Sequence, residues 1–205
     1  MHHSVNSSTT LRPGGRSTRL KSITLFLTTL VLAMLAGSVA AQAQAPTLVV
    51  TAIDAGRFYG DPNPAFTSTI TGLNSGDNIT VTFSTVANTS SAAGSYQIIP
   101  TLVDPDGKLG NYVVVINNGT LTVTPAPLII IADDMTRSAG NPNPTFTGSV
   151  QGLKNGDAIT ATQDSPATVD SPAGSYTIVP TLQDASGNIG NYSVSVSNGT
   201  LTITP

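Results

Sequence analysis

The sequence lacks cysteine, tryptophan and glutamate, and its only two histidines are His2 and His3. Without cysteine no disulfide can form. Beyond residue 3 there is no Ser-His-Asp triad, Cys-His pair or histidine-containing zinc site. All eleven acidic residues are aspartate, and none lies in an apolar context that would raise its pKa for acid catalysis. We therefore expect a chain that is not an enzyme and needs no cofactor.

Positive charge is also scarce, because the chain has only eight lysines and arginines, and four of them lie within the first 21 residues. The remaining four are scattered, and against eleven aspartates they leave a net charge of −7. They are Arg57, Lys108, Arg137 and Lys154. Such sparse bases argue against nucleic acid or an anionic membrane as a partner.

The first 45 residues differ in kind from the rest. Basic residues at 12–21 precede an apolar run at 23–35, and small residues follow up to Ala45. This order is typical of a secretory signal peptide, so we predict cleavage after Ala43 or Ala45. The alternative is an uncleaved membrane anchor, but threonines dilute a run that is short against the roughly 20 residues a bilayer requires. We predict an exported protein, secreted or held at the cell envelope or surface, with no membrane span in the mature chain.

Residues 126–205 repeat residues 46–125 without insertion or deletion, so each landmark recurs 80 positions later, as Gly60 does at Gly140. Self-similarity at a fixed period indicates an array of like units. We expect two domains with these bounds. The connecting segment, Pro125-Ala126-Pro127, is short and proline-rich, so the domains should follow head to tail with limited swing.

Each copy contains short alternating runs of Thr, Ser, Val and Ile broken by Gly, Pro, Asn and Asp, which is the pattern of strands joined by turns. In the first copy the predicted strands are 47–53, 65–71, 78–84, 95–101, 111–117 and 120–125. We predict an all-β protein of two tandem, small antiparallel β-sandwiches of immunoglobulin-like character. The alternative is a β-grasp, whose helix would have to occupy 72–78 or 84–93, windows that are glycine-rich or, in the second copy, interrupted by proline.

The sharpest local prediction concerns Asn118-Gly119, which lies between two β-rich runs. Both residues tolerate the positive φ of a type I′ turn, so the pair predicts a hairpin between 111–117 and 120–125. Its inward face would carry Val114 and Ile116, opposite Val123 and Leu121.

Aspartates in equivalent turns of the two copies are weak candidates for calcium. Asp104-Pro105-Asp106-Gly107 begins like a calcium loop, and the second copy has Asp184 at the equivalent position. The acidic residue that would close such a loop is missing in both copies, so an Asp-Gly turn is the simpler interpretation.

Three aromatic residues of the first copy have no aromatic counterpart in the second. They are Phe58, Tyr59 and Phe83. If exposed together they could form a surface for stacking sugars, whereas burial would mean that they only pack the first copy differently.

The ordered motifs of both copies resemble the bacterial MBG domain of the YGX type. In the first copy they are Tyr59-Gly60-Asp61 before Pro62-Asn63-Pro64, Gly94-Ser95-Tyr96, Gly110-Asn111-Tyr112 and Asn118-Gly119-Thr120-Leu121. The second copy departs where Ala139-Gly140-Asn141 replaces Tyr-Gly-Asp. The resemblance implies an exported, repetitive, non-catalytic module of adhesin-like surface proteins.

Two functions are compatible with these observations. The first is a non-enzymatic secreted or cell-surface repeat protein whose modules act as a spacer or as adhesion-type binding units. The alternative is a carbohydrate-binding module that uses Phe58, Tyr59 and Phe83. The partner would accordingly be a surface protein or a glycan, and the sequence defines no oligomeric state.

Overall fold

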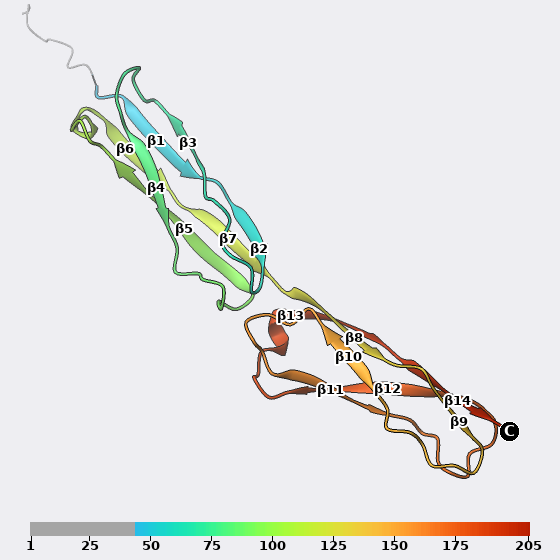
Figure 1. Ribbon diagram of the computed structural model, residues 1–205. Helices are drawn as coiled ribbons and strands as arrows, with labels where there is room; N and C mark the ends of the chain where they lie inside the picture. Colours follow the sequence, from blue (N-terminus) through green and yellow to red (C-terminus); the bar gives the residue numbers. More distant parts are fainter. Residues whose placement is uncertain (1–43) are drawn as a thin grey trace, which may run out of the picture. The chain divides into compact units, whose positions relative to one another are not determined.

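The computed structural model describes residues 44–205, of which Ala45–Pro205 form one compact unit (Figure 1). The predicted signal peptide lies outside the described residues, apart from its last two positions. Within the described range there is no helix that is long and apolar enough to cross a membrane.

Each repeat contains seven strands and one 3-10 turn, at equivalent positions. The first repeat has β1 (Thr47–Ala52), β2 (Ala55–Phe58), β3 (Ser68–Thr71), β4 (Thr80–Ser84), β5 (Gly94–Val103), η1 (Leu109–Asn111), β6 (Val113–Asn117) and β7 (Gly119–Thr124). The second has β8 (Ala126–Ala132), β9 (Met135–Ser138), β10 (Gly148–Gln151), β11 (Ile159–Asp164), β12 (Gly174–Asp184), η2 (Ile189–Asn191), β13 (Tyr192–Ser197) and β14 (Gly199–Thr204).

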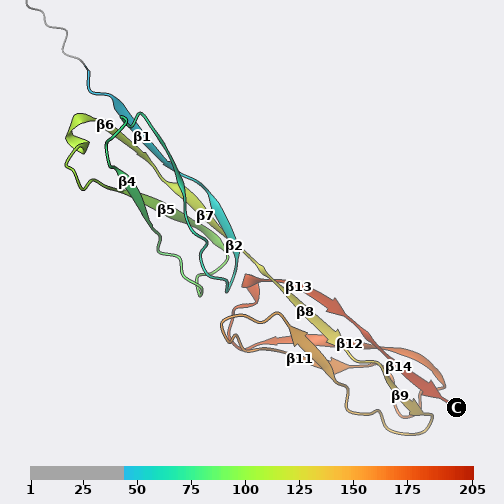
Figure 2. The ribbon, with the colours of Figure 1, turned by 45° about the horizontal axis from the view of Figure 1, so that its top comes forward.

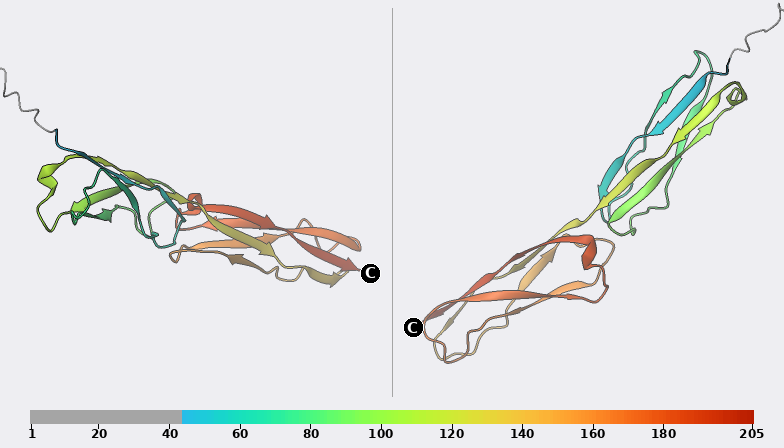
Figure 3. Two further views of the ribbon diagram at one scale, coloured as in Figure 1. Left: turned by 90° about the horizontal axis from the view of Figure 1, so that it is seen from above. Right: turned by 180° about the vertical axis from the view of Figure 1, so that it is seen from behind.

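The strands of each repeat form two sheets. In the first repeat the orders are β3-β1-β6 and β2-β7-β5-β4, and in the second β10-β8-β13 and β11-β12-β14-β9. The two sheets of a repeat lie against each other (Figure 3). The prediction of an all-β chain with two tandem β-rich units is confirmed. No α-helix occurs in residues 44–205, so the β-grasp alternative does not apply to them.

Alternation along the strands produces the core. Leu48, Val50 and Ala52 of β1 are buried while the residues between them are not. Leu48 and Val50 pack with Ile70 of β3, and across the sandwich with partly buried side chains of β4 and β5. Period-two burial of this kind is what the sequence pattern predicts for a sheet with one face on the core.

Strand pairing is mixed rather than wholly antiparallel, which corrects the prediction of an antiparallel sandwich. β1 pairs with β6 in parallel and β2 pairs with β7 in parallel, and the second repeat has the same two pairs. The cause is that the chain changes sheet twice without reversing. β1 continues into β2 across Ile53-Asp54, and β6 continues into β7 across Asn118 (Figure 2).

The predicted hairpin at Asn118-Gly119 is therefore wrong. Neither residue has positive φ, and β6 and β7 belong to different sheets. Val114 and Ile116 are 38% and 46% exposed, and β6 is an edge strand of its sheet. Gly119 is needed for space instead of φ, since a Cβ there would lie 3.0 Å from the carbonyl oxygen of Ala52. The sequence signal was a real glycine requirement with a different cause.

The connection between the repeats is shorter than the predicted linker. β7 ends at Thr124 and β8 begins at Ala126, so Pro125 is the single residue between strands. Ala126 is fully buried, and Pro127 lies within β8. A connection of one proline leaves little conformational freedom.

Candidate functional site: the junction between the repeats

The three copy-specific aromatic residues do not form a common exposed surface. Phe58 is 49% exposed, whereas the next residue, Tyr59, is 2% exposed. Phe83 is partly buried and contacts Phe66 edge to face, with ring centroids 6.3 Å apart. Successive residues at the end of a strand point to opposite sides, which separates Phe58 from Tyr59. A sugar-stacking platform of all three rings is therefore not assembled.

The calcium candidates act as acceptors for backbone N–H groups. Asp104 accepts hydrogen bonds from the N–H of Leu109 at 2.7 Å and of Lys108 at 2.9 Å. These bonds lower the pKa of the Asp104 carboxyl. In residues 44–205 no group of three or more acidic or histidine side chains is arranged to hold a metal ion. Asp106 is exposed in the same turn.

Asp184 has the same arrangement in the second repeat. Its carboxylate accepts hydrogen bonds from the backbone N–H of Ile189 at 2.9 Å, and from Gly187 and Asn188 at 2.9 and 3.3 Å. The Ile189 bond is the main cause that lowers the pKa of Asp184. In both repeats the aspartate fixes the loop that leads into the 3-10 turn.

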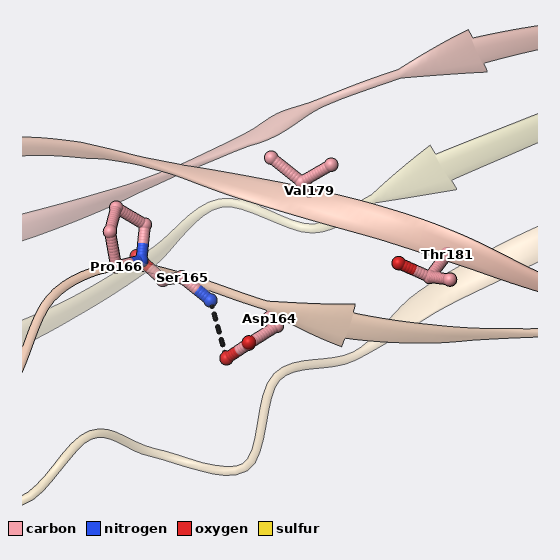
Figure 4. Close-up of a pocket in the computed structure, with 5 residues that line it drawn as sticks. All are labelled: Asp164, Ser165, Pro166, Val179 and Thr181. Carbon is pink, nitrogen blue, oxygen red and sulfur yellow. Dashed lines mark hydrogen bonds between the residues drawn. The ribbon is translucent and has the colours of Figure 1, made fainter.

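A surface cavity of about 290 Å³ lies where β11 ends beside β12 (Figure 4). Its lining is Asp164, Ser165, Pro166, Val179 and Thr181. The single ionisable group, Asp164, accepts a hydrogen bond from the backbone N–H of Ser165 at 2.8 Å. With one carboxylate and no base, the cavity offers no acid–base pair for catalysis.

The contact between the two repeats combines hydrophobic packing, an aromatic pair, hydrogen bonds and an ion pair. One hydrophobic cluster runs through both of them, joining Leu121 and Val123 of β7 to Ala126 and Leu128 of β8. Tyr59 belongs to the same cluster and follows directly after β2. Its ring meets that of Tyr192, from the start of β13, edge to face with centroids 5.5 Å apart. Buried aromatic contacts of this geometry contribute about 0.5–1.5 kcal/mol beyond their buried area.

A carboxylate links the two tyrosine hydroxyls. The Tyr59 hydroxyl donates to Oδ2 of Asp157 at 3.1 Å, and the Tyr192 hydroxyl donates to the same oxygen at 2.6 Å. Asn188 donates to the other carboxylate oxygen at 2.6 Å. In return, the backbone N–H of Lys154 donates to the Tyr192 hydroxyl at 2.9 Å. The carboxylate is thus satisfied by donors from both repeats.

The two residues after Tyr59 complete the contact. A Cβ on Gly60 would lie 2.4 Å from Cβ of Lys154, so only glycine allows this approach. Gly60 also has φ +83°, a conformation that other residues rarely adopt. Asp61 forms an ion pair with Lys154, with 2.9 Å between carboxylate and ammonium. Both side chains are more than one third exposed, so the pair contributes only about 0–1 kcal/mol.

The loop before β5 adds two hydrogen bonds across the junction. The side-chain amide of Asn155 donates to the carbonyl oxygen of Thr89 at 3.1 Å. The backbone N–H of Ala93 donates to the side-chain oxygen of Asn191 at 2.9 Å. Polar contacts therefore surround the tyrosine pair, a common arrangement for a specific interface.

The second repeat lacks the counterpart of this surface. Ala139, Gly140 and Asn141 stand where the first repeat has Tyr59, Gly60 and Asp61, and all three are exposed. Gly140 keeps a positive φ of 80°, but a Cβ there would meet nothing within 4 Å. The turn conformation is thus shared by both copies, whereas the side chains that make the junction belong to the first copy alone.

Burial and the neighbouring Asp157 raise the pKa of Tyr192 to about 12. Because the unfolded value is 10.0, the protonated hydroxyl stabilises the folded protein fully below pH 10. That contribution is lost as the pH rises from about 10 through about 12. Burial and the hydrogen bond to Asp77 also raise the pKa of Tyr112, so ultraviolet absorbance titration should show Tyr192 ionising near pH 12 among more than one late-titrating tyrosine. The Tyr192→Phe variant should lose that component; an unchanged titration curve would contradict the assignment.

Sequence reasoning missed a buried arginine in each repeat. Arg57 is 8% exposed and donates to Asn63 at 2.7 Å, to the carbonyl of Phe58 at 3.0 Å, and to the carbonyl of Asn88. Arg137 occupies the equivalent place. A signal existed, since each arginine precedes by six residues an asparagine held between two prolines.

Comparison with protein families gives a match over both repeats. The model described as MBG domain (YGX type) matches residues 48–122 and 128–202, in agreement with the resemblance of the motifs. Among curated proteins, none matches this chain. Tandem MBG domains are consistent with a non-enzymatic surface repeat protein, and the domain is typical of extracellular or surface proteins.

Proposed function

Because the chain belongs to the MBG family of the YGX type, we propose that it is a secreted or cell-surface protein whose modules act as a spacer in adhesion and catalyse no reaction. The observation that carries the spacer function is the burial of Tyr59. The side chain of Tyr59 packs in the contact between the repeats and is 2% exposed, so it is not accessible to a ligand.

A spacer must hold successive modules in a fixed relation, because slack at each junction would lose the reach that extra modules provide. Three features supply that restraint here. Only Pro125 separates β7 of the first repeat from β8 of the second, and the hydrophobic cluster is continuous across this connection. Asp157 accepts hydrogen bonds from the hydroxyls of Tyr59 in the first repeat and Tyr192 in the second.

The absence of catalysis is proposed from the chemistry of the chain. Beyond residue 3 it carries no histidine, and it has no cysteine or glutamate. The two aspartates with shifted pKa values, Asp104 and Asp184, have them lowered by backbone hydrogen bonds. A lowered pKa disfavours a role as general acid near neutral pH. Export is proposed from the N-terminal segment, which precedes the described residues.

The spacer is tested by the distance between the repeats in solution. Because the chain has no cysteine, spin labels can be placed at Thr82→Cys and Thr162→Cys, two exposed and equivalent strand positions. We expect a single narrow distance distribution by pulsed electron paramagnetic resonance. A broad distribution would contradict a spacer. Glycan binding that is lost on Phe58→Ala would instead favour the carbohydrate-binding alternative, since Phe58 is the exposed member of its three aromatics.

A further inference from the structure

The first repeat carries the same aspartate and tyrosine that receive Tyr59 in the second. The hydroxyl of Tyr112 donates to Asp77, as that of Tyr192 donates to Asp157. The backbone N–H of Asn74 donates to the Tyr112 hydroxyl at 3.0 Å, which reproduces the bond from Lys154 to Tyr192. One end of the first repeat is therefore built like the surface that forms the junction.

The two surfaces also share a third residue. Asn191, which accepts a hydrogen bond across the junction, has Asn111 as its counterpart in the first repeat. Three positions differ, since Asn74 stands for Lys154, Ser75 for Asn155, and Lys108 for Asn188, which donates to Asp157. The retained residues are those that meet the tyrosine and the backbone of the neighbour. Two of the three changed positions meet the neighbour: Lys154 meets Asp61, and Asn155 meets the carbonyl of Thr89.

We propose that Asp77, Asn111 and Tyr112 form a second docking site, whose partner is the Tyr-Gly turn of another module of this family. The junction inside the chain is the template. A tyrosine hydroxyl would donate to Asp77 while its ring lies against Tyr112, and glycine at the next position would admit the close approach. Because Asn74 replaces Lys154, the partner needs no acidic residue after its glycine.

This docking site is selective for its partner. A second copy of the chain presents Ala139-Gly140-Asn141 on its second repeat, without the tyrosine, and its Tyr59 is already buried in its own junction. Copies of this chain therefore do not join end to end through it. Asymmetric contacts of this type produce open chains when one molecule presents both complementary surfaces. This chain presents the docking site without a free Tyr-Gly turn, so its copies do not assemble into such chains.

The inference does not depend on the spacer function, because the two repeats can hold each other whether or not Asp77 and Tyr112 bind anything. The spin-label experiment tests only the internal junction. The experiment below tests only the proposed docking site, so either proposal can fail alone.

The test rebuilds the missing turn. In the chain from Ala45 to Pro205, the substitutions Ala139→Tyr, Asn141→Asp and Asn74→Lys would recreate the tyrosine, aspartate and lysine of the junction at the two outer ends, while Ser75 and Lys108 stay as they are. All three positions are exposed, so the fold should be retained. Sedimentation velocity up to about 1 mM protein, where weak contacts become detectable, should show a rise in the weight-average coefficient with concentration. The unsubstituted chain should show no such rise.

Two further substitutions show whether the association uses the proposed contact. Gly140→Ala has nothing within 4 Å to collide with in the chain itself, but it should block docking as a Cβ on Gly60 would block the internal junction. Asp77→Ala should remove the acceptor for the tyrosine hydroxyl. The rebuilt chain should return to the monomer coefficient with either change. A rebuilt chain that stays monomeric, or one that associates equally with Gly140→Ala, would overturn the proposal.

Discussion

Replacing Gly60 with alanine should release the two repeats from each other, whereas the same replacement at Gly140 should leave the junction intact. Both glycines have positive φ, 83° and 80°, so each alanine costs about 1–2 kcal/mol in backbone strain. Only the Cβ at residue 60 meets another group. It would lie 2.4, 2.7 and 2.9 Å from Cβ, Cγ and Cδ of Lys154, separations that atoms do not tolerate.

The lysine stem cannot yield without breaking other contacts. Its first atom is fixed to the backbone, and that backbone N–H holds the Tyr192 hydroxyl. We expect the spin-label distance distribution between the repeats to broaden in Gly60→Ala and to stay narrow in Gly140→Ala. Thermal unfolding provides the control, since the strain common to both variants should lower both midpoints, and Gly60→Ala, which also loses the junction contacts, should lower its midpoint further. Equal distributions in the two variants would refute the role given to Gly60.

Arg137→Ala should destabilise the second repeat by about 3 kcal/mol or more. The guanidinium donates to Asn143 at 2.8 Å, to the carbonyl of Ser138 at 3.1 Å, and to the carbonyl of Thr168. Its removal leaves three acceptors without a hydrogen-bond donor at a site where the arginine is 8% exposed. Each unsatisfied buried group costs about 1–3 kcal/mol. Urea unfolding followed by circular dichroism measures the loss.

A charge-matched control is available in Lys108→Ala. Lys108 is exposed, and the contacts recorded for it use its backbone, so its replacement should change the free energy of unfolding by no more than about 0.5 kcal/mol. Arg137→Lys keeps the charge but cannot reach three acceptors, and it should fall between the two. A loss from Arg137→Ala no larger than that from Lys108→Ala would show that the arginine network is not structural.

Alternation in the sequence predicted six of the seven strands of the first repeat, because it depends only on which residues face the core. It missed β2 (Ala55–Phe58), which has only four residues. Along β1, Leu48, Val50 and Ala52 alternate with less buried positions and are themselves all buried. The path between sheets was not predictable in the same way. Asn118-Gly119 satisfies the requirements of a tight turn, and local propensity does not reveal that the glycine instead makes room for the backbone of Ala52.

The sequence identified one side of the junction, Tyr59, but not the residues that contact it. Comparing the two copies singled out Tyr59 as specific to the first, and the copy difference was correct. Its partner, Asp157, lies 98 residues away, and no local pattern connects the two. Burial of Arg57 was hidden for a similar reason, since its acceptors include the carbonyl of Asn88, 31 residues further along the chain.

The parallel pairing of β1 with β6 and of β2 with β7 has a mechanical consequence. The chain enters the first repeat through β1 and leaves it through β7. Tension along the chain therefore pulls β1 against its parallel partner β6, and β2 against its parallel partner β7, along the length of the strands. Five residue pairs join β1 to β6 and four join β2 to β7. Their hydrogen bonds are loaded in shear and must fail together, whereas a hairpin would open one bond at a time. A module of this topology resists traction even though it contains no covalent cross-link between strands.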